Sequence, residues 1–500
     1  MSFHQYHVAG FIETNEKLWG KTIDNIKIYS FDQIKKLTHS KNITLLFLAD
    51  EAIDLELKNE IVNYCLAQDI EVKIIPPVQN WIHGQLFVNQ LQNVKIEDLL
   101  NRPVIKLTND HVTKYLKGKR ILITGAAGSI GSEITRQIAD IDPHSIMLCD
   151  QSESCLYELE YQLTQKFGKR DNIKNFIGDI KDNETMKHLF AAFKPEVVFH
   201  AAAYKHVPLM EKHPSAAVKN NILGTKILAD LSETYSVERF VLVSTDKAIN
   251  PTNVMGATKR IAELYIGSLH HKNKNTNGHT DIKPPTKYIT TRFGNVLDSS
   301  GSVIPRFKQQ IEKGGPVTVT HPDIIRYFMT IPEACSLVLD ACTIGKGGET
   351  FVFDMGEPVK ILDLANTMIK LAGMTPDKDI KIEFTGLRPG EKLFEELLNN
   401  KEKVMPTHHK KIMISKGYNQ DFTSIDLNVN YLIELALHNK NTDVVKQMKL
   451  MIPEFKSKNS VFEILDKEIL NKENMENLNS NEHNSIHGNV IEPHIIKHIF

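Results

Sequence analysis

A short polar stretch, STDKAINPTNVMGATK from residue 244, holds the side chains best suited to chemistry. Thr245, Asp246 and Lys247 offer a hydroxyl, an acid and an amine in succession. Met255 and Lys259 follow at about one helical turn's spacing, which puts them on one face of a helix. An acid beside an amine can supply and remove protons, and a hydroxyl can hydrogen-bond a reacting oxygen. These five residues are the catalytic candidates; a solvated loop with an ion pair is the alternative interpretation.

A strand must end just before this stretch for its side chains to converge, and the run RFVLVS, residues 239–244, predicts that strand. Upstream, in RILITGAAGSIGSEITRQIA from residue 120, an apolar run gives way to Gly125, Gly128 and Gly131 and then to a helical pattern. Glycines there let bare backbone approach a pyrophosphate while the helix N-terminus offers free N–H groups. The pattern predicts a dinucleotide loop; a strand, turn and helix without a ligand is the alternative.

The next predicted strand ends at Asp150, about 20 residues past the glycines. A carboxylate there can hold the adenosine ribose and would repel a 2′-phosphate, which favours NAD over NADP. Later strand ends, at GDIKD and HAAAYKHVPLME, bring further residues to the same crevice. Besides Asp150, the cofactor candidates are Gly125, Gly128, Ser129, Ile130, Gly131, Asp179, Ile180, Ala201, Ala202 and Lys259.

Lys205 and His206 follow the strand predicted at residues 197–201, so they face the crevice or its rim; for His206, capping or packing is the alternative. Neutral donors and guanidinium groups further on are the kind that hold a sugar diphosphate, although each alone is more often a surface group. We expect the last of these segments, GLRPGEKL, to be a loop that enters a helix. The further substrate candidates are Asn295, Ser302, Arg306, Arg326, Arg388 and Glu391.

The composition excludes several classes of protein. The 500-residue chain has a formal net charge of −1, so no whole-protein field favours nucleic acid. No apolar run reaches the roughly 18 residues that a membrane span needs. The five cysteines lie mostly in apolar runs, which is typical of reduced thiols in a cytosol. Histidines in a polar loop expected at residues 268–286 lack ligand partners, so no metal site is predicted.

Alternating strands and helices predict an α/β fold, a doubly wound parallel-sheet Rossmann domain with a smaller C-terminal substrate-binding subdomain. A partial second Rossmann-like domain is expected before it, with buried parallel strands at residues 26–29, 43–49 and 71–75 but no glycine loop. The expected divisions are a truncated domain at 1–100, a linker at 101–118, the main domain at 119–416, a helical extension at 417–470 and a disordered tail at 471–500.

Over residues 119–416 the chain resembles the nucleotide-sugar 4,6-dehydratases of bacterial polysaccharide biosynthesis, which are extended short-chain dehydrogenases/reductases. The resemblance lies in TGAAGSIGSE, HAAAYKHVPLME, STDKAINPTNVMGATK, RFGNVLDSSGSVIPRF, RYFMTIPEA and GLRPGEKL. Large members carry amino-terminal membrane helices followed by a second Rossmann-like domain. Residues 1–100 of this chain resemble the end of that second domain. The resemblance implies a cytoplasmic homo-oligomer, placed at the inner face of the membrane if a longer native form exists.

The resemblance also implies a redox-neutral reaction on a UDP-N-acetylhexosamine, with UDP-GlcNAc the first choice. Tightly bound NAD takes hydride from sugar C4, water leaves across C5 and C6, and the hydride returns to C6, giving UDP-2-acetamido-2,6-dideoxy-4-hexulose with C5 retained. By matching residues, Thr245 hydrogen-bonds the C4 oxygen, Asp246 protonates the leaving hydroxyl and Lys247 removes the C5 proton. Lys259 matches the lysine that binds the nicotinamide ribose. A lysine base must be neutral, so we expect burial beside Lys259 and the positive nicotinamide to lower the pKa of Lys247.

Met255 departs from the superfamily's YxxxK pattern, in which a tyrosine accepts the C4 hydroxyl proton. A thioether cannot accept that proton. Some members of the dehydratase group also have methionine here. Our hypothesis is that Asp246 or a water linked to Lys259 takes the proton.

Three other functions remain open from the sequence. The first is a C5-inverting dehydratase, although the RPGEK segment and the amino-terminal domain look more like the retaining group. A UDP-sugar 4-epimerase is disfavoured, because epimerisation does not need the elimination pair Asp246 and Lys247. A non-catalytic NAD- and UDP-sugar-binding protein would explain the missing tyrosine but not the retained pair.

Overall fold

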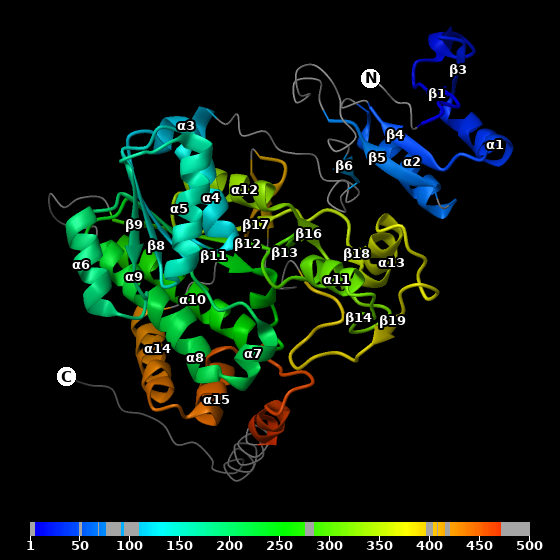
Figure 1. Cartoon of the computed structure of the whole chain (residues 1–500). Coiled ribbons are helices and arrows are strands. Elements are labelled where there is room, and N and C mark those ends of the chain that lie inside the picture. Colours follow the sequence, from blue (N-terminus) through cyan, green and yellow to red (C-terminus); the bar gives the residue numbers. More distant parts are fainter. Residues whose placement is uncertain are drawn as a thin grey trace, which may run out of the picture.

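The structure is a computed structural model with a large α/β body and smaller units beside it (Figure 1). It describes residues 6–49, 53–68, 70–76, 92–94, 110–275, 285–396, 404–407, 409–415 and 421–471. The expected disordered tail lies almost wholly outside these residues.

A nine-stranded sheet forms the centre of the large body, in the order β20-β21-β17-β12-β11-β10-β7-β8-β9. The seven strands from β17 to β9 are parallel, and β21 and β20 add antiparallel pairs at the other edge. The predicted doubly wound parallel sheet is therefore confirmed. The strands are β7 (Arg120–Thr124), β8 (Ser145–Asp150), β9 (Ile173–Ile177), β10 (Val197–His200), β11 (Arg239–Thr245), β12 (Lys287–Phe293), β17 (Thr350–Phe353), β20 (Val404–Pro406) and β21 (Ile412–Ser415).

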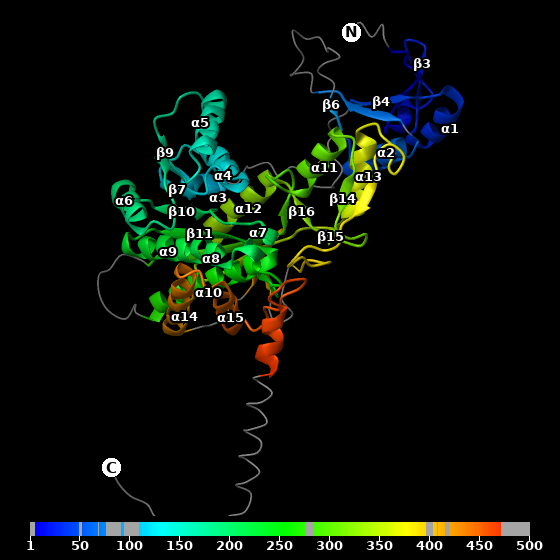
Figure 2. The same cartoon turned by 60° about the horizontal axis from the view of Figure 1, so that its bottom comes forward.

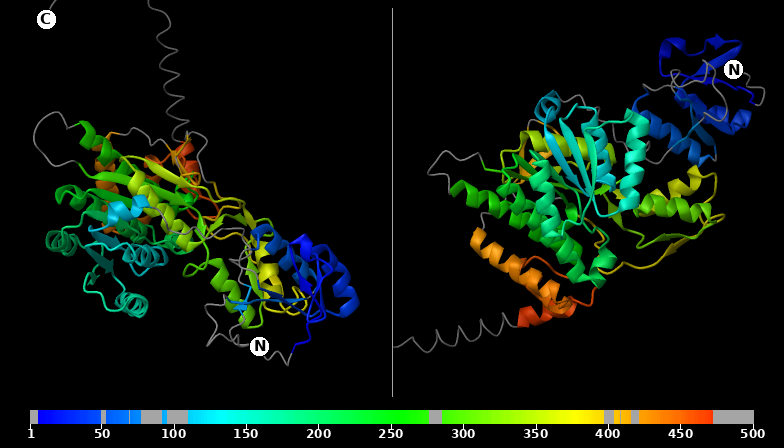
Figure 3. Two further views of the ribbon diagram at one scale, coloured as in Figure 1. Left: turned by 90° about the horizontal axis from the view of Figure 1, so that it is seen from above. Right: turned by 60° about the vertical axis from the view of Figure 1, so that its left-hand side comes forward.

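Helices cover both faces of this sheet (Figures 2 and 3). Along β7, Ile121 and Ile123 enter one hydrophobic core and Leu122 the other, as the two-residue period of a strand requires. The first core contains α3 (Asp110–Leu116), α4 (Ser129–Ala139), α5 (Glu153–Phe167) and α12 (Ile331–Ile344). The second contains α6 (Asn183–Phe193), α7 (Val207–Lys212), α8 (Pro214–Val218), the π-helical η5 (Lys219–Leu223), α9 (Gly224–Thr234) and α10 (Val254–Asn275).

Two sequence expectations change at the borders of this body. The linker expected at 101–118 contains α3, whose Val112 and Leu116 are buried in the first core. The polar loop expected from residue 268 is wrong at its start, because α10 continues to Asn275 with Ser268 and Leu269 buried. Local polarity concealed this last part of the helix.

A second, smaller unit carries much of the expected substrate subdomain. Short strand pairs and two helices surround one core, which includes Phe307, Val317 and Leu364. Its elements are β13 (Asn295–Val296), α11 (Val303–Glu312), β14 (Val317–Val319), β15 (Ile325–Arg326), β16 (Phe328–Met329), β18 (Val359–Lys360), α13 (Ile361–Leu371) and β19 (Ile382–Phe384).

The amino-terminal unit lies against α13 in all views, through α2 (Leu55–Ala67) (Figures 1 to 3). β4 (Leu45–Leu48) and β5 (Glu71–Ile74) pair in parallel as expected, and β6 (Gln92–Asn93) joins β5. The expectation that residues 26–29 belong with them is wrong. These residues form β3 (Ile26–Tyr29) in a separate sheet with β1 (Phe11–Ile12) and β2 (Thr22–Ile23), before α1 (Phe31–Lys41).

The carboxy-terminal helices return to the large body. α14 (Phe422–Leu437) packs on α10 and α8, and α15 (Asn441–Met451) packs on α14 and α8. A last helix spans residues 463–471. Across the described ranges, no helix combines the length and hydropathy that a membrane crossing requires.

Candidate active site

The turn from β7 into α4 brings backbone against backbone. Gly125 has a φ of +66°, and a Cβ added there would lie 2.6 Å from the backbone of Ala202. At Gly131 an added Cβ would lie only 2.2 Å from the carbonyl oxygen of Gly125. Only glycine fits both places, and α4 begins at Ser129 with Gly128 as its N-cap. The predicted loop therefore presents its backbone at the carboxyl ends of the strands.

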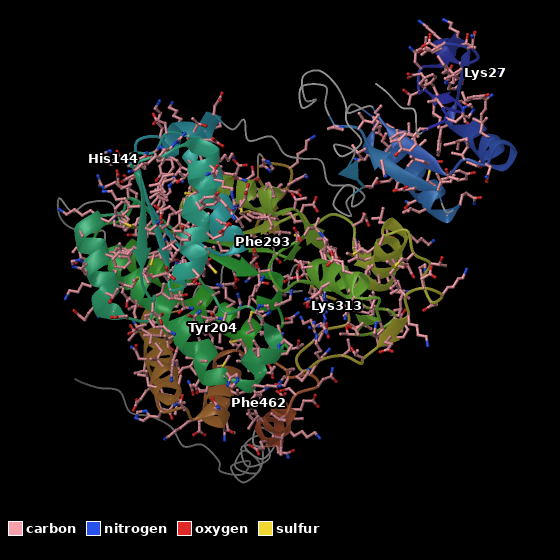
Figure 4. The ribbon with its side chains drawn as sticks, viewed as in Figure 1. Lys27, His144, Tyr204, Phe293, Lys313 and Phe462 are labelled. Atoms are coloured by element: carbon pink, nitrogen blue, oxygen red, sulfur yellow. The ribbon has the colours of Figure 1, made fainter. Side chains whose placement is uncertain are left out.

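A cavity of about 160 Å³ opens beside this turn, at the point where strand order reverses between β7 and β10. Tyr204, labelled in Figure 4, stands on its lining. Seven of the cofactor candidates also line it, namely Gly125, Gly128, Asp150, Asp179, Ile180, Ala201 and Ala202.

The carboxylates of this cavity are held in fixed positions. Asp150 accepts hydrogen bonds from the N–H groups of Ala127 and Ser152, both at 3.0 Å. Asp179 pairs with the Lys181 ammonium at 3.0 Å. A glycine cradle with an acid at the end of the second strand fits a dinucleotide such as NAD.

The catalytic candidates meet where β11 ends in the short helix η6 (Asp246–Ala248). The Thr245 hydroxyl donates to Asp246 Oδ1 at 2.8 Å, and the Lys247 ammonium donates to the same oxygen at 2.9 Å. Lys247 also donates to Asn295 Oδ1 at 3.0 Å. Asp246 is only 2% exposed, and its Oδ2 is buried with no hydrogen-bond partner in the part of the chain that the structure describes. The hydroxyl of Thr245 and the amine of Lys247 thus donate to the same oxygen atom of the Asp246 carboxylate.

The expectation of a lowered pKa for Lys247 is wrong. Burial alone would lower this pKa, but the carboxylates of Asp246 and Glu395 outweigh burial and raise it. Glu395 Oε1 lies 3.8 Å from the Lys247 nitrogen, and the charge of Arg326 opposes the two carboxylates only in part. In this form of the protein Lys247 is therefore an ammonium.

Met255 and Lys259 occupy the first turns of α10, as their spacing predicts. Met255 is 3% exposed and packs into the second core. Lys259 is 4% exposed, and burial lowers its pKa to about 8, although Glu263 opposes the shift. Burial, and then the charge of Lys259, lower the pKa of His200, so Lys259 lies near the carboxyl end of β10.

Replacing Lys259 with methionine should stabilise the nucleotide-free protein by about 3 kcal/mol at pH 7. The folded pKa, about 8, is below the ordinary 10.5, so folding penalises the charged amine below pH 8. The penalty disappears as pH rises from about 8 to 10.5, where the folded protein binds fewer protons than the unfolded chain. Urea unfolding at both ends of this range measures the difference. An equal gain at both ends would contradict the explanation.

The predicted substrate residues lie on several different elements. Asn295 reaches Lys247, as described. Ser302 is the N-cap of α11, and no group in the described ranges hydrogen-bonds its buried hydroxyl. Arg306 is exposed on the same helix. The structure thus joins Asn295 to the catalytic cluster and leaves Arg306 apart from it.

Two cations, Lys205 and Arg388, lie near His206 on the rim. Burial, and then the charges of Lys205 and Arg388, lower the pKa of His206. Glu391 fixes Arg388 through two contacts, Nε to Oε2 at 3.2 Å and Nη2 to Oε1 at 3.0 Å. A rim of this charge attracts an anion.

Arg326 lies below the rim and is 8% exposed. Its guanidinium donates to the carbonyl oxygens of Ile325, Leu393 and Lys392, and to Glu391. It therefore holds the segment that carries Glu391, and direct contact with a substrate remains a prediction. Residues 385–396 of this segment are not helical, so the helix expected after the loop does not begin at Lys392.

A family profile described as polysaccharide biosynthesis protein matches residues 121–417. The chain belongs to this family. Capsular polysaccharide biosynthesis protein CapD of Staphylococcus aureus is 45% identical over 411 residues, which are 82% of this chain and 67% of that protein. The probable polysaccharide biosynthesis protein EpsC of Bacillus subtilis is 48% identical over 72% of this chain and 58% of its own length. The chain therefore spans about two thirds or less of these two relatives.

One further relative and one solved structure are also similar to this chain. The inverting UDP-N-acetylglucosamine 4,6-dehydratase of Campylobacter jejuni is 32% identical over 57% of this chain and 78% of that protein. The crystal structure of Pen from Bacillus thuringiensis is 32% identical, with a TM-score of 0.54 over 64% of this chain and 98% of that chain. The resemblance to extended short-chain dehydrogenase/reductase nucleotide-sugar dehydratases is confirmed.

The sequence analysis did not identify two carboxylates at or near the site, Glu211 and Glu395. Glu211 accepts the Val254 N–H at 2.6 Å at the start of α10 and the Ser460 hydroxyl at 2.6 Å, so it ties α10 to the carboxy-terminal extension. Glu395 approaches Lys247 from a distant loop. Glu211 ends the quoted HVPLME motif, which was a usable signal, whereas nothing local to Glu395 indicated its partner.

Proposed function

We propose that this chain catalyses the NAD-dependent 4,6-dehydration of a UDP-N-acetylhexosamine, UDP-GlcNAc first. The product would be UDP-2-acetamido-2,6-dideoxy-4-hexulose with C5 retained, an early intermediate of bacterial surface glycan synthesis. The observation that carries this proposal is the cluster of Thr245, buried Asp246 and half-buried Lys247 at the end of β11, at the same sheet edge as a cavity that fits a dinucleotide. Elimination of water needs one group to give a proton and another to take one.

The cluster can supply both groups from one shared proton. In the described form the proton sits on Lys247, hydrogen-bonded to Asp246 at 2.9 Å. Transfer along this bond would give a neutral amine and a protonated carboxyl together, which are the base and the acid that dehydration requires. The amine would then take the C5 proton and Asp246 would give its proton to the leaving C6 hydroxyl, which restores the ion pair.

Thr245 would donate to the sugar C4 oxygen, with its hydroxyl turned from Asp246. The loop residues Gly125 to Gly131 and Asp150 would hold NAD, and Lys259 the nicotinamide ribose. Bound NAD would supply reversible hydride transfer. Arg388, fixed by Glu391, would meet the diphosphate together with Lys205 and His206. A homo-oligomer at the inner face of the membrane remains a prediction.

The test is proton NMR of UDP-GlcNAc incubated with the purified protein in deuterated water, without added NAD. A 6-deoxy-4-keto sugar with deuterium at C5 is expected, because Lys247 would exchange its proton with solvent. The C5 configuration of the product then distinguishes the retaining reaction from the inverting one. The inverting reaction is the second candidate, because the Campylobacter relative is named as an inverting dehydratase.

Other results would overturn the proposal. A change of C4 configuration without loss of water would indicate an epimerase, an activity named for Rickettsia relatives at 32% identity. No reaction with UDP- and dTDP-sugars even after NAD is added, combined with NAD and UDP-GlcNAc binding, would favour a non-catalytic binding protein.

A further inference from the structure

Glu395 brings a buried carboxylate to the catalytic cluster from far along the chain. It lies in the segment after β19, and its side chain is 4% exposed. Oε1 lies 3.8 Å from the Lys247 nitrogen and 3.9 Å from Arg326 Nε. Oε2 is buried and has no hydrogen-bond partner in the described ranges. Such an oxygen is costly to a fold, which suggests another use for the side chain.

The neighbours of Glu395 fix where its charge acts. Backbone carbonyls occupy most donors of Arg326, so this guanidinium is a rigid anchor beneath the carboxylate. The remaining cation near Glu395 is Lys392, whose ammonium donates to the carbonyl of Ile249 at 2.9 Å. Glu395 is thus free to act on Lys247.

Four polar or charged side chains from different parts of the chain surround the Lys247 ammonium. Asp246 lies on the same short helix, Asn295 on β13, Arg326 on β15 and Glu395 on the later segment. Asp246 and Asn295 each accept one hydrogen bond from the ammonium, and Glu395 Oε1 is the next carboxylate oxygen, at 3.8 Å. Of the two carboxylates around Lys247, only Glu395 adds negative charge without a hydrogen bond to the proton shared with Asp246.

We propose that Glu395 is the positioning residue for Lys247, a carboxylate that orients the amine and sets its affinity for the proton that it shares with Asp246. The catalytic meaning of this inference rests on the proposed function, but the coupling between Glu395 and Lys247 does not. A neutral residue at position 395 should release Lys247 as a nucleophile and base. Arg326 and Glu391 would keep the segment in place.

Competitive acetylation of the ligand-free full chain, followed by peptide mass spectrometry, measures the pH midpoint of Lys247 reactivity. In Glu395→Gln the midpoint should fall by about one pH unit or more, so Lys247 should react about tenfold faster at a fixed pH near 8. Glu395→Asp retains the charge and should stay within about threefold of the wild type. Glu396→Gln is the matched control, because its carboxylate is 47% exposed and pairs with Lys392 at 3.9 Å.

An unchanged midpoint in folded Glu395→Gln, or an equal fall in Glu396→Gln, would overturn the proposal. If Glu395→Gln does not fold, Glu395→Met, an apolar side chain of similar length, is titrated in the same way. The same fall of the Lys247 midpoint supports the proposal, and an unchanged midpoint refutes it. Failure of wild-type dehydration together with the expected midpoint shift would reject the proposed function and leave the Glu395 coupling standing.

Discussion

Replacing Lys247 with methionine is expected to lower the turnover of UDP-GlcNAc by about 10³-fold. The variant loses the amine that takes the C5 proton, and Asp246 loses the partner that delivers its proton over 2.9 Å. Incorporation of deuterium at C5 should fall with product formation, since both depend on the same amine. NMR of the reaction in deuterated water follows both quantities.

The loss must be separated from misfolding, because methionine leaves Asp246 and Glu395 without a cation between them. Lys247→Arg keeps the positive charge there but cannot become a neutral base, so it should fold and be as inactive. Lys313→Met is the matched control, since Lys313 lies exposed after α11 (Figure 4) and should turn over normally. Activity of Lys247→Arg near that of the wild type would assign the base to another group.

The sequence predicted the large sheet because its signals are local. Continuous apolar runs, typical of parallel strands buried on both faces, predicted β10 and β11 within one residue and the end of β8 at Asp150. The glycines at residues 125 and 131 were readable for the same reason, since Gly125 has a φ of +66° and an added Cβ at Gly131 would meet the carbonyl oxygen of Gly125. The family motifs then added roles that periodicity could not supply.

What the sequence could not reveal depends on distant partners. The pKa of Lys247 was expected to fall through burial beside Lys259 and the nicotinamide, yet Asp246 and the sequence-distant Glu395 raise it. Residues 268–275 look like a solvent loop by composition, but the core beneath Ser268 and Leu269 keeps them helical. Tertiary contacts decide both cases, and a single sequence does not contain them.

Gly256→Ala should reduce turnover by about 10²-fold, as expected when catalytic groups are displaced by about 1 Å. Gly256 lies in the first turn of α10, and an added Cβ would lie 2.1 Å from the carbonyl oxygen of Lys247 and 2.9 Å from its carbonyl carbon. Both atoms belong to backbone, so the helix or η6 must move. That movement displaces Lys247 relative to Asn295, whose Oδ1 accepts its hydrogen bond. Steady-state kinetics and urea unfolding measure the change, with a stability loss of about 1–3 kcal/mol expected.

Gly267→Ala provides the matched control on the same helix. An added Cβ at Gly267 meets no atom within 4 Å, so alanine should raise the free energy of unfolding by about 0.5–1 kcal/mol through its better helix propensity. Turnover should stay at the wild-type rate. Because both substitutions add one methyl group to α10, only the contact with Lys247 distinguishes them. Equal kinetics for the two variants would mean that close packing of α10 on η6 does not hold Lys247 in place.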